Sequence, residues 1–345
     1  MILSRVNYTY SYLNLETPFQ LEQGGVIEQP VIAYNTYGKL NANKDNVIFI
    51  CHALTANSDA DDWWHGLFGE NDIFDWDKHF IICANNLGSP YGGSSAKQIN
   101  TANGEIYGLD FPFFTIRDTA NFHIDLLKHF NIDKIKMLIG GSCGGNIAQE
   151  IAYTLGDRIE NLVLLCCSSR ETPWAIAIHQ AQRLILEADK TISNKTATAG
   201  ISGLKACRAA ALPYYRTQKS FNLRQNEISL NIVDNFRASS YINYQGDKFI
   251  KRFNAQCYYT LLNALDTHNI GRNRNSIEEA LSKISANTAV IGFQSDLLIP
   301  TNEQQFLAKH IPNATYYEIK SIYGHDAFLI EHDYIRKAIR SKIKI

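Results

Sequence analysis

Three side chains suited to nucleophilic acyl chemistry lie far apart in this chain: Ser142, Asp296 and His325. Ser142 is the central residue of a G-x-S-x-G motif, Gly140 to Gly144. An apolar run at 135–139 predicts a strand before the motif, and helical apolar spacing follows it. Small residues around a serine at such a strand-to-helix turn allow a sharp turn that exposes the hydroxyl. The motif is short, so a glycine-rich connection with an inert serine is the alternative.

A serine hydroxyl needs a base, and the base needs a third group to orient it. Asp296 follows a predicted strand at 288–293, and His325 follows another at 315–320. Residues just past the carboxyl ends of parallel strands meet at one edge of the sheet. The order serine, acid, histidine is the one found with strand-turn-helix nucleophiles. We therefore predict that Ser142 is the nucleophile, His325 the general acid-base and Asp296 the orienting carboxylate.

The negative oxygen formed by attack on a carbonyl needs hydrogen-bond donors. The N–H of Cys143, directly after the nucleophile, is one candidate. A predicted strand at 46–52 ends in His52, and the N–H of Leu54 just beyond it is the other candidate. His52 could itself act in catalysis, but a histidine at a strand end is more often structural, and we favour that interpretation.

The elements that must position these residues alternate between strand and helix. Further strands are predicted at 80–85 and 161–167, a helix capped by Asp118 at 119–130, and edge hairpins within 1–45. This order predicts an α/β fold with a mostly parallel sheet covered on both faces. A long loop, 86–108, is expected to be functional or mobile.

Residues 168–285 contain helical patterns and no convincing strand, with amphipathic stretches at 174–189 and 249–265. We predict that residues 1–167 and 286–345 form the α/β core. The intervening residues 168–285 are predicted to form a helical lid insertion over the active-site end of the sheet.

Composition narrows the possible functions. The chain has 345 residues, 45% of them hydrophobic, and a formal net charge of -1, which gives no reason to expect nucleic acid or an acidic membrane as partner. No apolar run approaches the roughly 20 residues of a membrane-spanning helix, and the start lacks a signal-peptide pattern, so we expect a cytoplasmic protein. Of the seven cysteines, Cys51, Cys83, Cys166 and Cys167 lie in or at the ends of apolar runs and are expected to be core residues and not a disulfide framework. No metal-ligand spacing occurs, so we expect neither a metal nor a bound cofactor.

The chain resembles the homoserine O-acetyltransferase family, which has the α/β-hydrolase fold. The resemblance extends in order from about residue 46 to 331. Tyr244-Gln-Gly-Asp-Lys-Phe249 and Tyr323-Gly-His-Asp-Ala-Phe-Leu329 are its most specific segments. The other matching segments are Cys51–Thr55, Asn86–Gly88, Phe111-Pro112, Thr115–Asp118, Gly140–Gly145, Trp174–Ala177, Gln182-Arg183, Tyr241, Arg252-Phe253, Ala264–Asp266 and Ser295-Asp296.

The resemblance implies a two-step exchange in methionine biosynthesis. Ser142 would take an acetyl group from acetyl-CoA as cosubstrate, and the γ-hydroxyl of L-homoserine would then take it from the acetyl-serine. A lid that narrows the approach would exclude water from this intermediate. The resemblance also implies a homodimer formed through the insertion helices, although the aromatic residues from Phe249 to Tyr259 could equally belong to the core.

By the same resemblance, Arg208 and Tyr215 would bind the carboxylate of the acceptor, and Asp326 would bind its ammonium group. Seven residues separate Arg208 from Tyr215, so they would share a face of a regular helix, but Pro213 is expected to bend or end that helix. A surface arginine and a helix-capping aspartate are the alternatives for Arg208 and Asp326.

Several alternatives stay open. Methionine is frequent in the family where this chain has Cys143, and residues 91–100 depart from the usual proline-containing run. The donor could therefore be succinyl-CoA, with Lys97 or Arg117 near its distal carboxylate, although Arg117 is more readily interpreted as structural. The acceptor could be serine, since one methylene gives only about 1–3 kcal/mol of discrimination. A small-ester serine hydrolase and a non-catalytic binding protein are the remaining alternatives.

Overall fold

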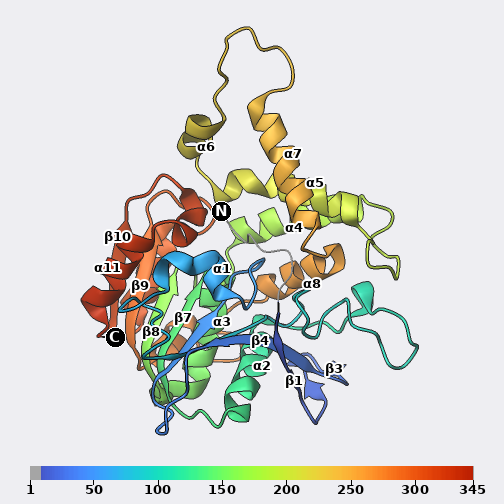
Figure 1. Cartoon of the computed structure of the whole chain (residues 1–345). Coiled ribbons are helices and arrows are strands. Elements are labelled where there is room, and N and C mark those ends of the chain that lie inside the picture. Colours follow the sequence, from blue (N-terminus) through green and yellow to red (C-terminus); the bar gives the residue numbers. More distant parts are fainter. Residues whose placement is uncertain (1–8, 345) are drawn as a thin grey trace.

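One eight-stranded sheet organises the chain, whose residues 9–344 are described by a computed structural model (Figure 1). Its strands, in the order in which they pair across the sheet, are β1 (Ser11–Asn14), β4 (Val31–Tyr37), β6 (Phe80–Ala84), β5 (Val47–Cys51), β7 (Ile135–Gly141), β8 (Ile159–Leu165), β9 (Asn287–Phe293) and β10 (Ala314–Ile319). β4 pairs antiparallel with β1 and β6, and every other pair is parallel. β2 (Phe19–Gln20) and β3 (Val26–Ile27) form a separate hairpin.

Helices cover both faces of this sheet. One face carries α2 (Ile116–His129), α3 (Cys143–Leu155) and α10 (Thr301–His310), and the other carries α1 (Ala60–Trp64) and α11 (His332–Lys342). Short 3-10 helices lie at His65–Leu67, Gly108–Asp110, Gly156–Arg158 and Gly324–Leu329. Successive residues of β5 alternate between the two cores, Phe49 in one and Ile48 and Ile50 in the other. Burial on both faces explains why the parallel strands appear in the sequence as continuous apolar runs.

The predicted α/β-hydrolase fold is therefore confirmed. The six strands predicted after residue 45 correspond to β5 through β10, with ends that differ by at most two residues. The expectation of edge hairpins within 1–45 is only partly met. β1 and β4 pair across an intervening hairpin and are not consecutive strands, and residues 1–8 lie outside the described residues.

The start of α2 differs from the prediction. The helix begins at Ile116, and Thr115 is its N-cap, whereas Asp118 was predicted to cap a helix starting at 119. The Thr115 side chain accepts from the Asp118 N–H, and the Asp118 carboxylate accepts from the Thr115 N–H. This reciprocal pair is a capping box, in which the acid three residues into the helix supports the cap.

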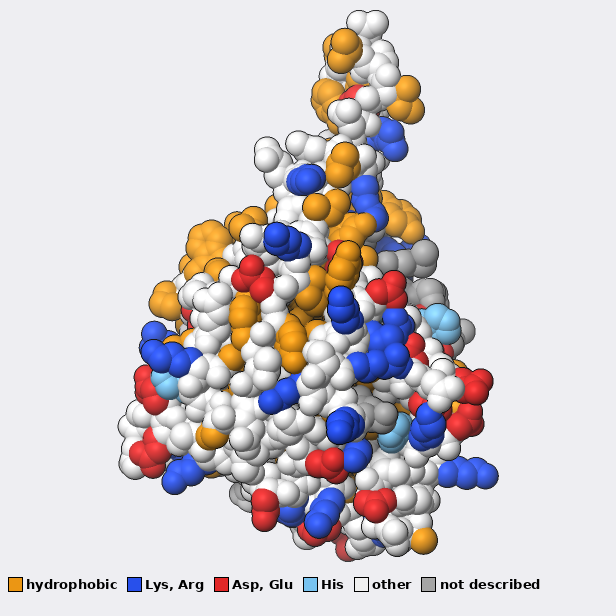
Figure 2. Space-filling model, turned by 90° about the vertical axis from the view of Figure 1, so that its left-hand side faces the viewer, with side chains coloured by type: hydrophobic (Ala, Val, Ile, Leu, Met, Phe, Trp, Pro, Cys, Tyr) orange, Lys and Arg blue, Asp and Glu red, His pale blue; other side chains and the backbone are white. Residues whose placement is uncertain are grey.

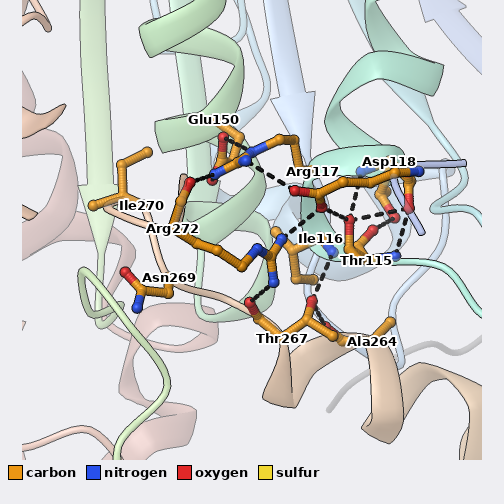
Figure 3. Close-up of polar contacts among 12 residues, drawn as sticks. Thr115, Ile116, Arg117, Asp118, Glu150, Ala264, Thr267, Asn269, Ile270 and Arg272 are labelled. Carbon is orange, nitrogen blue, oxygen red and sulfur yellow. Dashed lines mark hydrogen bonds and ion pairs between the residues drawn. The ribbon is translucent and has the colours of Figure 1, made fainter. Parts of the chain in front are cut away.

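Figure 3 shows charged side chains, half-buried except for the buried Glu150, that join α2 and α3 to the chain around residue 270. Arg117 of α2 contacts Glu150 of α3 at 3.1 Å and Glu22 at 2.9 Å. Arg272 contacts Glu22 at 2.6 Å, and Arg274 contacts Glu150 at 2.7 Å. Glu150 is buried, and leaving its charge without the arginine partners would be strongly destabilising. Arg117 is thus structural, the interpretation that the sequence favoured.

Residues 168–285 contain helices and no strand. They are α4 (Pro173–Glu187), α5 (Ile201–Tyr215), α6 (Gln218–Gln225), α7 (Arg237–Ile250), α8 (Ala255–Asp266) and α9 (Ile277–Ser282). Figure 1 shows α4, α5 and α7 stacked over one end of the sheet, with α6 and α7 projecting furthest from it. Whether these residues behave as a separate lid stays a prediction.

The amphipathic stretch predicted at 249–265 is interrupted. α7 ends at Ile250, and α8 begins only after the N-cap Asn254, whose side chain accepts from the Cys257 N–H at 2.9 Å. Phe249, Phe253 and Tyr258 are buried across this break and pack ring against ring. These aromatic residues therefore belong to the core of the insertion, one of the two interpretations that the sequence left open.

Loop 86–107 has neither helix nor strand, but much of it is buried. The Ser94 N–H donates to the Val31 carbonyl, and the Val31 N–H donates to the Ser94 hydroxyl oxygen, both at 2.9 Å. The Asn85 side chain donates to the Tyr91 carbonyl at 2.7 Å. All seven cysteines are buried and free, including the four that were predicted to be core residues. Among residues 9–344, no helix combines the length and apolarity needed to cross a membrane.

Candidate active site

Ser142 occupies a strained turn between β7 and α3. Its φ of 55° and ψ of -127° lie in a region that residues with a side chain rarely adopt, at a cost of about 1–3 kcal/mol. A Cβ atom on Gly140 would lie 2.2 Å from the Gly144 carbonyl oxygen, and one on Gly144 would lie 2.0 Å from the Cys51 carbonyl oxygen. Glycine is therefore required at both positions. The turn is the one that the motif predicted.

A continuous hydrogen-bonded chain joins the three predicted triad residues. His325 Nε2 lies 2.8 Å from Ser142 Oγ, and His325 Nδ1 lies 2.7 Å from Asp296 Oδ2. The other oxygen of Asp296 accepts from the N–H groups of Leu298 and Ile299, both at 2.9 Å. The carboxylate is thereby fixed in place and fixes the imidazole in turn. The sequence placed these residues at one sheet edge, and the structure brings them into contact.

The electrostatic surroundings of His325 favour its charged form. Burial acts to lower the pKa of the imidazole, but the charge and hydrogen bond of Asp296, with a smaller contribution from Asp326, outweigh it. The pKa of His325 is therefore raised above its ordinary value. An imidazole with this bias can take up a proton from Ser142 and hold it through the reaction.

Leu54, the second predicted oxyanion donor, lies in the loop after β5. Leu54 lines the same cavity as Ser142, and its N–H donates to no acceptor within the described chain. Cys143 is the first residue of α3, so its N–H has no partner in the helix. Arg252, between α7 and α8, donates to the Thr55 carbonyl at 2.7 Å. The insertion thus holds the loop that carries Leu54.

His52 has a structural position. Its Nε2 accepts from the Asn86 N–H at 3.0 Å, and its Nδ1 lies 2.8 Å from the Ala53 carbonyl. Burial lowers the pKa of His52 to about 4, so the ring is neutral. Both nitrogens serve the backbone, which agrees with the interpretation that the sequence favoured.

Ser142 lines a cavity that opens to solvent. Arg208 and Tyr215 of α5 line it, and the Arg208 guanidinium lies 5.4 Å from the Tyr215 ring centre. The concern about Pro213 was misplaced, because α5 continues through it to Tyr215. Pro213 lies in the last turn of the helix, where its missing N–H removes only one of the final hydrogen bonds.

Asp326 also lines the cavity, directly after His325 in the chain. It is buried, and its Oδ2 accepts from Arg216 Nε at 3.0 Å. Arg216 follows α5, and nothing in the sequence suggested this contact, because 110 residues separate the pair.

Neither cation suggested for a succinyl donor lines this cavity. The Lys97 ammonium donates to the Pro90 carbonyl at 3.4 Å, and Arg117 is held by the carboxylates of Figure 3. Among the described residues that line the cavity, Arg208 is the only Lys or Arg. The structure therefore gives no support to a role for Lys97 or Arg117 in binding a succinyl donor.

Two buried polar groups were missed by the sequence analysis. His179 of α4 lines the cavity, and its Nδ1 lies 2.7 Å from Asp266 Oδ1. Glu171, in the loop after β8, is buried near Asn146 of α3. Burial, reinforced by the charge of Asp266, raises the pKa of Glu171 to about 8. His179 lies between two of the segments that resemble the family, Trp174–Ala177 and Gln182-Arg183, and its pairing with a residue 87 positions away left no signal in the sequence.

Within residues 9–344, one group of potential metal ligands has its atoms within 4.8 Å of one another, namely Cys166, Asp296 and His325. Two of these belong to the hydrogen-bonded chain that ends at Ser142. Burial raises the pKa of the Cys166 thiol well above its ordinary range, which disfavours the thiolate that a metal requires. The donor set does not fit a metal centre.

Comparison with known proteins identifies the relatives of this chain. Residues 46–331 match the model of the α/β hydrolase fold. The chain is 40% identical to a homoserine O-acetyltransferase from Cyclobacterium marinum, over 97% of this chain and 95% of the relative. It is 41% identical to that of Chlorobaculum parvum, over 93% and 90%.

Solved structures agree with these relatives. The homoserine O-acetyltransferase from Bacillus anthracis has a TM-score of 0.89 at 25% identity and covers 98% of both chains. Esterase E22 has the same TM-score at 23% identity, covering 97% of this chain and 100% of its own, and shares the fold.

Proposed function

The chain belongs to the homoserine O-acetyltransferase family of the α/β hydrolase fold, and from that premise we propose that it moves an acetyl group from acetyl-CoA to the γ-hydroxyl of L-homoserine. The observation that carries the proposal is the shared cavity. The hydrogen-bonded chain from Asp296 to Ser142 opens into the space that Arg208 and Asp326 also line. A cation and an anion beside one nucleophile suit an amino acid zwitterion.

In the first step, the Ser142 Oγ attacks the thioester carbonyl carbon while its proton moves to His325 Nε2. The negative oxygen is stabilised by the N–H groups of Leu54 and Cys143. The C–S bond then breaks, and the leaving thiolate takes the proton from His325. The products are free CoA and acetyl-Ser142.

In the second step, the γ-hydroxyl of homoserine gives its proton to His325 and attacks the acetyl carbon. The same N–H groups stabilise the second tetrahedral oxyanion. Its collapse releases Ser142, which takes the proton back from His325, and O-acetylhomoserine leaves. Arg208, supported by Tyr215, would bind the acceptor carboxylate, and Asp326 would bind its ammonium.

The donor is proposed to be acetyl-CoA because of the charges in the cavity. A succinyl group would bring a second carboxylate, which needs a cation of its own. Arg208 is the only Lys or Arg among the described lining residues, and the acceptor carboxylate would occupy it. The apolar lining residues Leu265, Leu298 and Phe328 suit a methyl group.

The proposal is tested by measuring free CoA release with acetyl-CoA or succinyl-CoA and with homoserine, serine or no acceptor. Release that depends on acetyl-CoA and homoserine supports the transferase. Release at the same rate without an amino acid would indicate a hydrolase, the activity that the fold also serves in esterases. Faster CoA release with serine than with homoserine would contradict the proposed acceptor. Faster release from succinyl-CoA than from acetyl-CoA would contradict the proposed donor.

We also propose that the protein is a homodimer joined by α6, α7 and the loop between them. This projecting segment carries apolar side chains that face solvent, most fully Ile228, Leu230 and Val233, which are 91%, 104% and 89% exposed. Figure 2 shows apolar side chains gathered on the projecting part. Apolar side chains that face water are unfavourable, and a second copy packed against this segment would bury them. A cytoplasmic location and a role in methionine biosynthesis follow from the proposed reaction.

A further inference from the structure

His179 has two hydrogen-bonding atoms with different surroundings. Its side chain is 4% exposed, and its Nδ1 lies 2.7 Å from Asp266 Oδ1. The residue lines the cavity of Ser142, and no hydrogen bond joins its Nε2 to another residue in the described chain. A ring nitrogen without a protein partner, on a side chain that lines a cavity, is free to bind a ligand there.

The partners of Asp266 determine what Nε2 can do. Asp266 accepts through Oδ1 from the Nδ1–H of His179 and through Oδ2 from Arg183 Nη2, also at 2.7 Å. The short distance from Nδ1 to Oδ1 fits the imidazole tautomer that has its proton on Nδ1. In that state Nδ1 carries the proton and Nε2 presents a lone pair to the cavity.

The polar groups that line the cavity leave few acceptors for an ammonium group. Ser142 and His325 are engaged in the chemistry, and Arg208 is a donor only. Asp326 has one oxygen committed to Arg216. A primary ammonium has three N–H donors, and burying them without acceptors is costly. Apart from hydroxyl groups, the lining side chains that can still accept a hydrogen bond from the ammonium group are Asp326, through its second oxygen, and His179, through Nε2.

We propose that His179 Nε2 accepts a hydrogen bond from the α-ammonium group of the acceptor amino acid, as a second partner beside Asp326. This inference rests on the proposed function and names a further residue that distinguishes amino acids from simple alcohols. α4 packs against α5 and α8, so the insertion brings His179 to the helix of Arg208 and to Asp266 at the end of α8. The hydrogen-bonded pair with Asp266 fixes the imidazole ring in the orientation that binding requires.

The test separates the two nitrogens. His179→Asn keeps a side-chain amide that can donate to Asp266 but removes the atom that faces the cavity. His179→Gln carries its amide oxygen to about the position of Nε2 and serves as the conservative variant. Each protein is acetylated with acetyl-CoA, and the concentration of acceptor that half-saturates the acetyl-enzyme is read from discharge of the acetyl group or from competition with homoserine.

Two acceptors are compared: L-homoserine, and 4-hydroxybutanoate, which keeps the hydroxyl and the carboxylate but lacks the ammonium. We expect His179→Asn to raise the half-saturating concentration of homoserine about tenfold or more, the effect of one hydrogen bond to a charged group. The value for 4-hydroxybutanoate and the acetylation rate should match the unaltered protein. His179→Gln should recover most of the loss.

Three results would overturn the inference. An equal loss for both acceptors would mean that His179 contacts the carboxylate or the hydroxyl. A slower acetylation step would place His179 on the acyl-CoA donor. No change in His179→Asn would leave it a structural residue. If the unaltered acetyl-enzyme is not discharged by homoserine, the proposed function fails and this inference fails with it.

Discussion

The Nε of Arg216 donates to Oδ2 of Asp326 at 3.0 Å. Asp326 directly follows His325 in the chain. The Arg216 guanidinium also lies 5.5 Å from the ring centre of Tyr241 on α7. Asp326, which is proposed to bind the ammonium group, is therefore held in position by the Arg216 guanidinium of the insertion. The contact connects the projecting helices to the acceptor end of the cavity.

Arg216→Met should weaken acceptor binding without slowing acetylation of Ser142. Methionine keeps apolar contact with Tyr241 but leaves the Asp326 carboxylate free to turn, so we expect the KM for homoserine to rise about tenfold. Steady-state and single-turnover rates with acetyl-CoA measure the two steps separately. Arg224→Met is the matched control, because Arg224 stacks on Tyr323 and contacts no carboxylate in the described chain. Equal slowing of both steps would refute this role.

Asp296→Asn should lower the acetylation rate by about 10³- to 10⁴-fold, because the amide no longer orients and charges the imidazole correctly. The pH profile should also move. His325 must be neutral to accept a proton, and its pKa is raised chiefly by Asp296, so the rate of the unaltered enzyme rises only as pH passes that raised pKa. In Asp296→Asn the remaining activity should reach its plateau at a lower pH. An unchanged profile would exclude His325 as the base.

Glu171→Gln should change the pH dependence of stability. Burial raises the pKa of Glu171 to about 8 in the folded protein, above the value of about 4.5 for an exposed carboxyl. The folded state then holds one more proton than the unfolded state between these values, so the free energy of unfolding falls as pH rises through this window. The amide removes that loss.

We therefore expect Glu171→Gln to match the unaltered protein near pH 4.5 and to be more stable by roughly 2–4 kcal/mol at pH 8. Urea unfolding at the two pH values measures the difference. Equal stability of the two proteins at pH 8 would show that Glu171 ionises normally in the fold.

Leu230→Asp with Val233→Asp should convert the proposed dimer to a monomer, because each charge would have to be buried against the second copy. Light scattering after gel filtration gives the mass directly. Ile99→Asp is the matched control, since Ile99 is 57% exposed and lies outside the projecting segment. A monomer before any substitution would contradict the proposed dimer.

The sequence predicted the sheet well because strands buried on both faces leave continuous apolar runs, and the triad because each member follows such a run. Contacts between distant polar residues could not be predicted in the same way. The pairs Arg216–Asp326 and His179–Asp266 join residues 110 and 87 positions apart, and only the packing of the insertion brings them together.

Local rules also failed where neighbouring structure outweighed them. Pro213 was expected to disturb α5, but it lies in the last turn, where little backbone hydrogen bonding remains to be lost. Asp118 was expected to cap a helix that in fact begins at Ile116, with Thr115 as its N-cap. The apolar pattern at 249–265 is continuous in the sequence because both sides of the break at Asn254 pack into one core.

The central claim is that Ser142 carries the acetyl group between donor and acceptor. It is tested most directly by the intact mass of the protein after mixing with acetyl-CoA alone and then with homoserine. The account predicts a stable gain of one acetyl group, absent in Ser142→Ala, that homoserine removes as O-acetylhomoserine. An acetyl group that forms equally on Ser142→Ala, or that water removes as fast as homoserine does, would contradict it.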